Sequence, residues 1–327
     1  MRTLLFLAAL GMATTAMAQG TPAIIFDMGG KFDKSFNEAA YNGAERYKTE
    51  TGTEYREFEI QNPAQREQAL RRLAQRGGDP VVAVGFSQGP ALETVAPEFP
   101  DSHFTIIDMV VEQPNVQSIV FKEQEGSFLV GALAAMASES GKVGFVGGMD
   151  VPLIRRFACG YEQGAKHIDP DVEVLQNMTG TTPAAWNDPA KGAELAQSQF
   201  DRGVDVVFAA AGGTGSGVYQ AAADAGKLAI GVDSNQNHLH PGTMLTSMVK
   251  RVDEAVFEAF QSAAAGNWEP GVKALGLAEG GVGWALDEHN QPLISEEMGA
   301  TMAELSEAIG SGEVVVHDYM SDESCSY

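Results

Sequence analysis

The sequence predicts an α/β protein made of two doubly wound lobes, each built on a parallel sheet. Short β-rich runs alternate with amphipathic stretches at a repeat of roughly 25 residues, which is the pattern of βα units. The chain has 327 residues. Because single cores seldom grow beyond about 250 residues, we expect it to divide into two lobes. Hydrophobic residues make up 44% and charged residues 20%, which is typical of a folded globular protein.

The expected strands are short runs rich in β-branched and aromatic residues. They are Ala23–Phe26, Tyr55–Ile60, Val81–Val84, Phe104–Ile107, Ser118–Phe121, Val143–Val146, Val172–Leu175, Val204–Phe208, Leu228–Gly231 and Met244–Ser247. The expected helices fill most of the gaps and are Phe36–Thr49, Pro63–Arg76, Ala91–Ala96, Gly126–Ala137, Leu153–His167, Pro189–Arg202, Val218–Ala225, Val252–Ala265 and Glu296–Ile309. This alternation predicts that all strands pair in parallel.

Local signals mark several helix ends. Ser35 and Glu38 are spaced as a capping box, which predicts that Phe36 lies in the first turn of a helix. Asp188 followed by Pro189 has the spacing of an N-cap and a first-position proline. In an open parallel sheet the ligand lies beyond the carboxyl ends of the strands, so the strand-to-helix loops are where a site is expected.

Residues 1–18 have the pattern of a cleaved signal peptide. Arg2 precedes the apolar run Leu4–Met12, and Ala16-Met17-Ala18 forms a cleavage site. The apolar run is shorter than the ~20 residues that cross a bilayer. The residue directly after the cleavage site is Gln19 and not a cysteine, so we expect a free periplasmic protein with no lipid anchor.

The charge balance argues against a nucleic-acid partner. The chain has 21 Lys and Arg against 44 Asp and Glu, a formal net charge of -23. Such a field repels nucleic acid and anionic lipid. We expect a monomer that binds a small molecule.

The chain has two cysteines, Cys159 and Cys325. Export to an oxidising compartment would allow a disulfide that pins the C-terminus. The alternative is one buried thiol and one thiol on a frayed end, and the sequence leaves both open because it does not place the two Cα atoms.

The segment Gly85–Gly89 is the strongest catalytic candidate. It places Ser87 between a strand and a helix, as in the nucleophile elbow of α/β-hydrolases. Triad partners could come from Asp233 and from His238, His240 or His289. No His-Gly-Gly oxyanion segment precedes Ser87, so an ordinary glycine-rich βα loop explains the segment equally well. A serine esterase using Ser87 remains an alternative function.

Two further motifs indicate neither a cofactor nor a metal. Gly212–Gly217 opens a helix after a strand, but it lacks both the P-loop lysine and the Gly-x-Gly-x-x-Gly spacing. Its backbone N–H groups could still bind oxyanions or hydroxyls. His238 and His240 have no clear third ligand, so a solvated loop is the expectation there.

Polar residues follow the carboxyl ends of several expected strands, and aromatic residues stand close to helix starts. The polar residues are Asp27, Asp108, Asp233 and Lys250, and the helix-start residues are Phe36, Asn37 and Trp186. Two flat aromatic side chains could sandwich a planar ring whose edge is read by an amide and carboxylates. A carboxylate beside a lysine suits vicinal hydroxyls. Together these residues indicate a cleft for a nucleoside.

Several segments resemble, in the same order, the basic membrane protein family of ABC-transporter substrate-binding proteins. The resemblance extends from about Thr21 to Asp318. The matching segments are Asp33-Lys34-Ser35-Phe36-Asn37, Tyr41-Asn42-Gly43, Phe104-Thr105-Ile106-Ile107-Asp108, Glu125-Gly126-Ser127-Phe128-Leu129-Val130-Gly131, Val143-Gly144-Phe145-Val146-Gly147-Gly148, Asp205-Val206-Val207-Phe208 with Ala211-Gly212-Gly213-Thr214-Gly215, Gly231-Val232-Asp233 and Leu245-Thr246-Ser247 through Lys250.

The resemblance implies a periplasmic-binding-protein type I fold, with two lobes joined by three hinge strands. It also implies that a purine stacks between Phe36 and Trp186 and that Asn37 and Asp108 read its edge. The ribose would be held by Asp233, Lys250 and the backbone at Gly212, with Asp27 near the site. Trp186 is larger than the phenylalanine often found there, which could change the preferred base.

We therefore expect a receptor that delivers a nucleoside such as adenosine, guanosine or inosine to an ABC permease, without catalysis. A sensor that passes its closed state to a membrane receptor is a second alternative with the same sequence features. We expect one lobe to contain residues 19–123 and about 249–276. The other lobe is expected to contain residues 124–248 and about 277–327.

Overall fold

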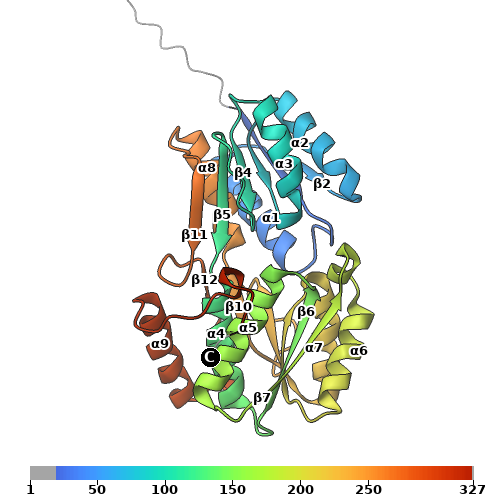
Figure 1. Ribbon diagram of the computed structural model, residues 1–327, viewed down its shortest axis with the longest axis vertical. Helices are drawn as coiled ribbons and strands as arrows, with labels where there is room; N and C mark the ends of the chain where they lie inside the picture. The colour runs from blue at the N-terminus through green and yellow to red at the C-terminus, as the bar shows by residue number, and fades with distance from the viewer. Residues whose placement is uncertain (1–19, 326–327) are drawn as a thin grey trace, which may run out of the picture.

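The computed structural model describes residues 20–325 and shows two α/β lobes, one above the other (Figure 1). The predicted signal peptide lies outside the described residues. Each lobe has one six-stranded sheet. In order across the sheet, lobe 1 contains β11 (Gly271–Leu275), β5 (Val116–Phe121), β4 (Phe104–Ile107), β3 (Gly78–Ala83), β1 (Thr21–Phe26) and β2 (Arg56–Glu59). Lobe 2 contains β12 (Val282–Trp284), β10 (Met244–Lys250), β9 (Leu228–Asp233), β8 (Val206–Ala210), β6 (Lys142–Met149) and β7 (Glu173–Gly180).

Helices cover both faces of each sheet because the parallel strands are apolar on both sides. The helices of lobe 1 are α1 (Phe36–Thr51), α2 (Arg66–Gln75), α3 (Gly89–Val95) and α8 (Val252–Ala264). The helices of lobe 2 are α4 (Glu123–Ala137), α5 (Pro152–Ile168), α6 (Pro189–Phe200), α7 (Gly215–Ala225) and α9 (Glu296–Gly310). In lobe 1, α1 packs on α8 and α2 on α3; in lobe 2, α4 packs on α5 and α6 on α7.

The sheets differ from the sequence prediction at one edge each. The strands β11 and β12 were not predicted, since they are short and lie in a segment of mixed polarity. The prediction of purely parallel pairing is wrong for β12, which pairs antiparallel with β10. The other pairs are parallel, so both lobes are doubly wound as predicted.

The chain crosses between the lobes three times. The crossings follow β5, β10 and β11, and they are hydrogen-bonded to one another. Lys122 N–H donates to the carbonyl of Leu275 (3.0 Å), and Arg251 N–H donates to the carbonyl of Gly281 (2.8 Å). This is the three-strand hinge of the predicted fold. The residues at which each lobe ends remain a prediction.

Cys159 of α5 and Cys325 are joined in a disulfide, with 5.5 Å between their Cα atoms. Of the two possibilities left open by the sequence, the structure shows the bridge. The segment that leads to Cys325 therefore lies against α5 of lobe 2.

Candidate functional site

A cavity, partly open to solvent, lies between the two lobes. All eight residues predicted to bind ligand line it: Asp27, Phe36, Asn37, Asp108, Trp186, Gly212, Asp233 and Lys250. The sequence did not point to the apolar remainder of the lining, which includes Met28, Phe86, Leu153, Ile154, Phe157 and Val232. Each of these taken alone has the pattern of a core residue.

The topology explains why these residues meet. In each sheet the strand order reverses between two neighbouring strands, β1 and β3 in lobe 1 and β6 and β8 in lobe 2. Such a reversal leaves a crevice at the carboxyl ends of the strands. Asp27 follows β1 and Gly85 follows β3, while Gly212 follows β8. The two crevices face each other, and their loops form the cavity.

The start of α1 differs from the predicted capping box. Ser35 makes no side-chain cap. Instead, the Asp33 carboxylate accepts from the N–H groups of Ser35 (2.8 Å), Asn37 (3.0 Å) and Glu38 (3.1 Å). Burial raises the pKa of Asp33 to about 6 despite these bonds. With the helix capped by Asp33, the Ser35 hydroxyl is free to bond elsewhere.

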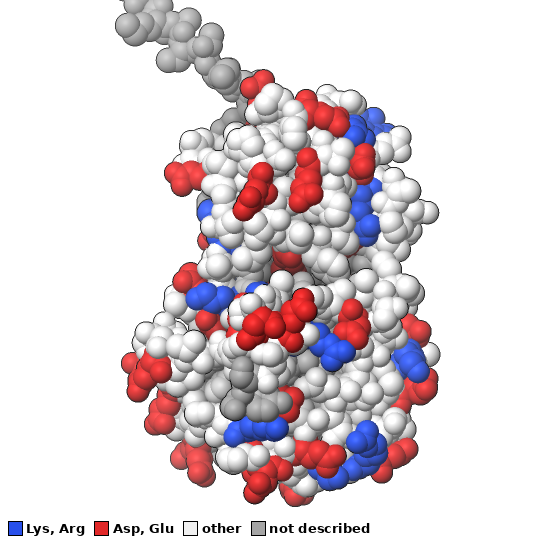
Figure 2. All heavy atoms as spheres, viewed as in Figure 1, with Lys and Arg blue, Asp and Glu red and all other residues white. Residues whose placement is uncertain are grey.

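The Ser35 hydroxyl crosses the cleft and donates to Asp233 of lobe 2. A second cross-lobe bond runs from Gln236 Nε2 to the carbonyl of Lys34 (2.7 Å). Both bonds need the lobes to be close together, so the structure is a closed conformation. Figure 2 shows the narrow waist where the lobes meet, with acidic side chains spread over both lobes on this face.

Lys250 is the buried cation of the site, with 2% of its surface exposed. Its Nζ lies 2.6 Å from Asp108 Oδ2 and 2.9 Å from Glu123 Oε1. It also faces the rings of Phe36 and Phe121, at 5.1 Å and 5.0 Å from their centroids. These contacts compensate for the loss of water around the ammonium group.

The pKa values in this cluster are shifted. Burial raises the pKa of Asp233 to about 6, against the lowering effect of Lys250. Burial likewise raises the pKa of Asp108 to about 6, although Lys250 lowers it. Burial alone would lower the pKa of Lys250, but Asp108, Glu123 and Asp233 together raise it, so Lys250 is charged at neutral pH. At pH 7 the cluster therefore offers carboxylate acceptors beside an ammonium donor.

Trp186 lies at the other side of the cavity, on the short helical turn Pro183–Trp186 that precedes α6. Its ring packs directly on Gly148 near the end of β6, where an added Cβ would come within 2.2 Å of Cζ3. A residue larger than glycine at position 148 would therefore displace the indole. Phe36, at the first position of α1, contributes an aromatic ring from lobe 1.

Asn37 and Asp27 are held by their own lobe. Asn37 Oδ1 accepts from the N–H of Asp27 (3.1 Å), and its Nδ2 donates to Asp33 Oδ2 (3.3 Å). The Asp27 carboxylate pairs with Arg66 (3.1 Å) and accepts from the hydroxyl of Ser87. Asp27 therefore orders the loops around it. Both amide hydrogens of Asn37 are donated within lobe 1, since its Nδ2 also donates to the carbonyl of Asp27 (3.4 Å).

The structure gives no support to a triad at Ser87. Its hydroxyl donates to Asp27, and Gly85 before it has φ 99°, where an added Cβ would meet Asp27 Oδ2 at 2.7 Å. His238 and His289, whose rings are 6.4 Å apart, belong to loops of lobe 2. Among residues 20–325 no hydrogen bond joins Ser87 to a histidine, and no cluster of three His, Cys, Asp or Glu side chains is placed to hold a metal.

The most important polar residue that the sequence analysis missed is Glu123. Its helix was expected to begin at Gly126, but α4 begins at Glu123, so this residue lies in the first turn and is fully buried. A carboxylate directly before an apolar helix is usually solvated. No local pattern in the sequence showed that Lys250 and Arg156 would surround it.

The paired lobes and the cavity between their crevices define a two-lobed binding protein of the periplasmic-binding-protein type I fold. The chain belongs to the Bmp family, described as ABC transporter substrate-binding protein PnrA-like, whose model matches residues 21–318. The resemblance inferred from the sequence is thereby confirmed.

Relatives and solved structures agree with this assignment. A solute-binding protein of an ABC transporter system from Aeropyrum pernix is 31% identical in sequence. The match covers 90% of this chain and 93% of that one, with a TM-score of 0.83. A Lactococcus lactis protein named ABC transporter nucleoside-binding protein BmpA is 32% identical over 288 residues, which is 81% of each chain.

One comparison corrects the predicted localisation. A Pyrococcus furiosus relative, 38% identical over 285 residues (81% of this chain and 70% of its own length), is named an uncharacterized lipoprotein. That name indicates lipid attachment, and it contradicts the prediction of a free periplasmic protein without a lipid anchor. The prediction was wrong because it rested only on the residues at the end of the signal segment. Those residues lie outside the part of the chain that the structure describes. No helix within residues 20–325 is long and apolar enough to span a bilayer.

Proposed function

We propose that this substrate-binding protein binds a nucleoside, with a purine base preferred, and passes it to an ABC permease. The observation that carries the proposal is that aromatic rings from both lobes and the buried Asp108–Lys250 pair line one cavity. The name of the Lactococcus lactis relative supports the ligand class. In this arrangement the base stacks between Phe36 and Trp186, while the sugar hydroxyls bond to Asp233 and Lys250.

Binding operates by lobe closure. The cross-lobe bonds from Ser35 to Asp233 and from Gln236 to Lys34 exist only when the lobes are close together. A ligand that contacts both lobes adds to the same interface and shifts the population towards the closed state. The closed form is then the one that the permease recognises, and no covalent bond changes during the cycle.

Asp233→Asn tests the assignment of the sugar site. The substitution keeps the shape of the side chain and removes the charged acceptor, so nucleoside binding should weaken by about 1.5–3 kcal/mol, or roughly 10- to 150-fold. Binding of the free base should change far less, because the base does not contact Asp233. Isothermal titration of guanosine and guanine, and of adenosine and adenine, measures both losses.

The matched control is Asp205→Asn. Asp205 is also a hydrogen-bonded carboxylate of lobe 2, but it caps the segment after α4, where it accepts from Ser138 (2.6 Å) and from the N–H of Ser140 (2.8 Å). It does not line the cavity. This variant should leave the ratio of nucleoside to base affinity unchanged. Equal losses for nucleoside and base in Asp233→Asn would contradict the sugar assignment.

A further inference from the structure

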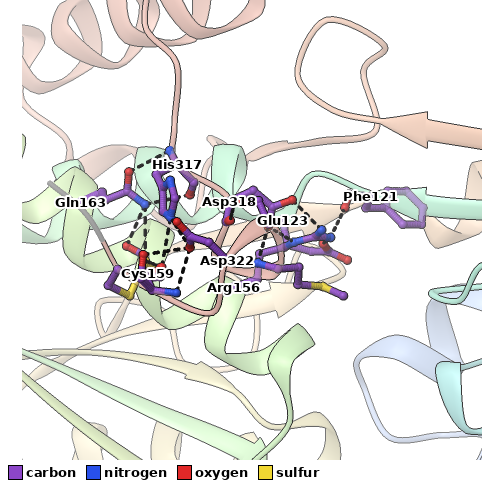
Figure 3. Close-up of polar contacts among 12 residues, drawn as sticks. Phe121, Glu123, Arg156, Cys159, Gln163, His317, Asp318 and Asp322 are labelled. Carbon is purple, nitrogen blue, oxygen red and sulfur yellow. Dashed lines mark hydrogen bonds and ion pairs between the residues drawn. A yellow bond between two sulfur atoms is a disulfide. The ribbon is translucent and has the colours of Figure 1, made fainter.

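A chain of alternating charges connects the cavity with the C-terminal segment, residues 314–325. Glu123 Oε1 lies 2.9 Å from Lys250 Nζ, and its Oε2 lies 2.9 Å from Arg156 Nη1. Arg156 then forms two bonds to Asp318, each 2.8 Å long. Figure 3 shows Arg156 between Glu123 on one side and Asp318 on the other. With Asp108 on the far side of Lys250, five charged side chains form one continuous path.

The outer end of this path is fixed to α5. Gln163 of α5 accepts from the N–H of His317 (2.9 Å) and donates to its carbonyl (3.0 Å). The disulfide between Cys159 and Cys325 holds the same segment four residues earlier on the helix. The segment thus holds Arg156 in place from outside.

Arg156 also reaches the hinge. Its Nη1 donates to the carbonyl of Phe121, the last residue of β5, at 2.9 Å. Glu123 follows two residues later, immediately after the first crossing between the lobes. Lys250 ends β10 at the second crossing. The path therefore joins two hinge strands at the point where they border the cavity.

The inner end of the path presents an unused acceptor. Asp108 Oδ2 accepts a hydrogen bond from Lys250. Its Oδ1 is buried and has no hydrogen-bond partner among the described residues. Asp108 lines the cavity. A buried carboxylate oxygen without a partner is costly unless a ligand donates to it. Glu123 shares the Lys250 ammonium, so Lys250 does not fully neutralise Asp108.

We propose that Glu123 and Arg156 are positioning residues for ligand binding: they hold the Lys250 ammonium between two carboxylates, so that Asp108 Oδ1 stays available to the ligand. Asp318 anchors this arrangement from the surface. The inference rests on the proposed function of the cavity as a nucleoside site. Neither Glu123 nor Arg156 lines the cavity, so they act through Lys250.

The test is Glu123→Gln, with guanosine and adenosine titrated from pH 5 to pH 8. The variant leaves Asp108 as the only carboxylate paired with Lys250, so affinity should fall at least tenfold. The charged groups facing Asp108 are Lys250, Glu123 and Asp233, and Glu123 and Asp233 both raise its pKa. Without Glu123 that pKa falls, so the pH below which binding weakens should move to a lower value.

Asp318→Asn is the second variant, and it keeps the buried residues intact. Its side chain is 31% exposed, so folding should be preserved. Loss of the bidentate pair leaves Arg156 held only by Glu123 and the carbonyl of Phe121, and affinity should fall about threefold to tenfold. The matched control is Glu98→Gln, which breaks the bidentate pair with Arg71 (2.8 Å and 2.7 Å) in lobe 1, away from the cavity. This control should keep the affinity and pH profile of the wild type.

The outcomes are separable. Weaker binding with a shifted pH profile in Glu123→Gln supports positioning, and a folded variant with wild-type affinity or an unshifted profile overturns it. If Glu123→Gln does not fold, Asp318→Asn decides by the same two readouts. A wild type that binds no nucleoside refutes the proposed function instead. The pH dependence of unfolding in ligand-free Glu123→Gln then decides whether Glu123 controls Asp108.

Discussion

Replacing Lys250 with methionine is expected to lower the free energy of unfolding by about 3–5 kcal/mol at pH 7. The substitution leaves Asp108 and Glu123 buried without their shared cation, and breaking a buried pair by removing one partner costs about this much. Burial already raises the pKa of Asp108 and Lys250 lowers it, so without Lys250 this carboxyl would take up a proton more readily in the folded state than in the unfolded state. The loss should therefore shrink as the pH falls towards 5, which urea unfolding at pH 7 and pH 5 measures.

The control for this prediction is Lys122→Met. Lys122 lies in the first hinge crossing, directly before Glu123. Its side chain is 40% exposed, and its pairs with Glu125 and Glu279 are 3.5 Å and 4.0 Å long. Exposed pairs of this kind contribute about 0–1 kcal/mol. A similar loss in both variants, or no dependence on pH in Lys250→Met, would show that the buried cluster is not the source of the effect.

Trp186→Ala is expected to weaken nucleoside binding by about 1–3 kcal/mol, or roughly 5- to 150-fold, because one face of the base loses its stacking partner. The free base should lose as much affinity as the nucleoside, in contrast to the variant at Asp233. Phe36→Ala should show the same pattern from the other lobe. Isothermal titration with adenosine, adenine and ribose separates base contacts from sugar contacts.

Trp268→Ala is the matched control for the tryptophan. This residue donates from Nε1 to Thr105 Oγ1 (3.2 Å) and packs on His103 in lobe 1, away from the cavity. It should lower stability without changing affinity. Unchanged affinity for the free base in Trp186→Ala would contradict the stacking assignment.

The fold was largely predictable because βα repeats leave a strong periodic signal. Strands such as Phe104–Ile107 are short, apolar and bounded by turn residues, and the structure has this strand at the same residues. The prediction failed for a strand whose formation depends on pairing with the adjacent strand of the sheet. In β11, Gly271–Leu275 is mostly exposed, and it forms only because β5 offers it an edge at the hinge.

The site was predictable to the extent that it is built from strand ends. Asp27 and Asp108 directly follow strands and Asp233 ends one, and parallel topology brings such positions together. The sequence did not show which residues far apart in the chain would form hydrogen bonds or ion pairs with each other. Ser35 appeared to be a helix cap, yet its hydroxyl bonds to Asp233, 198 residues away.

The most direct measurement is thermal unfolding of refolded, ligand-free protein with adenosine, guanosine, inosine, cytidine, uridine, the free bases, ribose and amino acids. Ligand at about 100 times its dissociation constant adds about 2.7 kcal/mol, which raises Tm by several degrees. We expect purine nucleosides to raise Tm the most and ribose and amino acids to leave it unchanged. A panel in which no nucleoside raises Tm would contradict the assignment of the cavity as a nucleoside site.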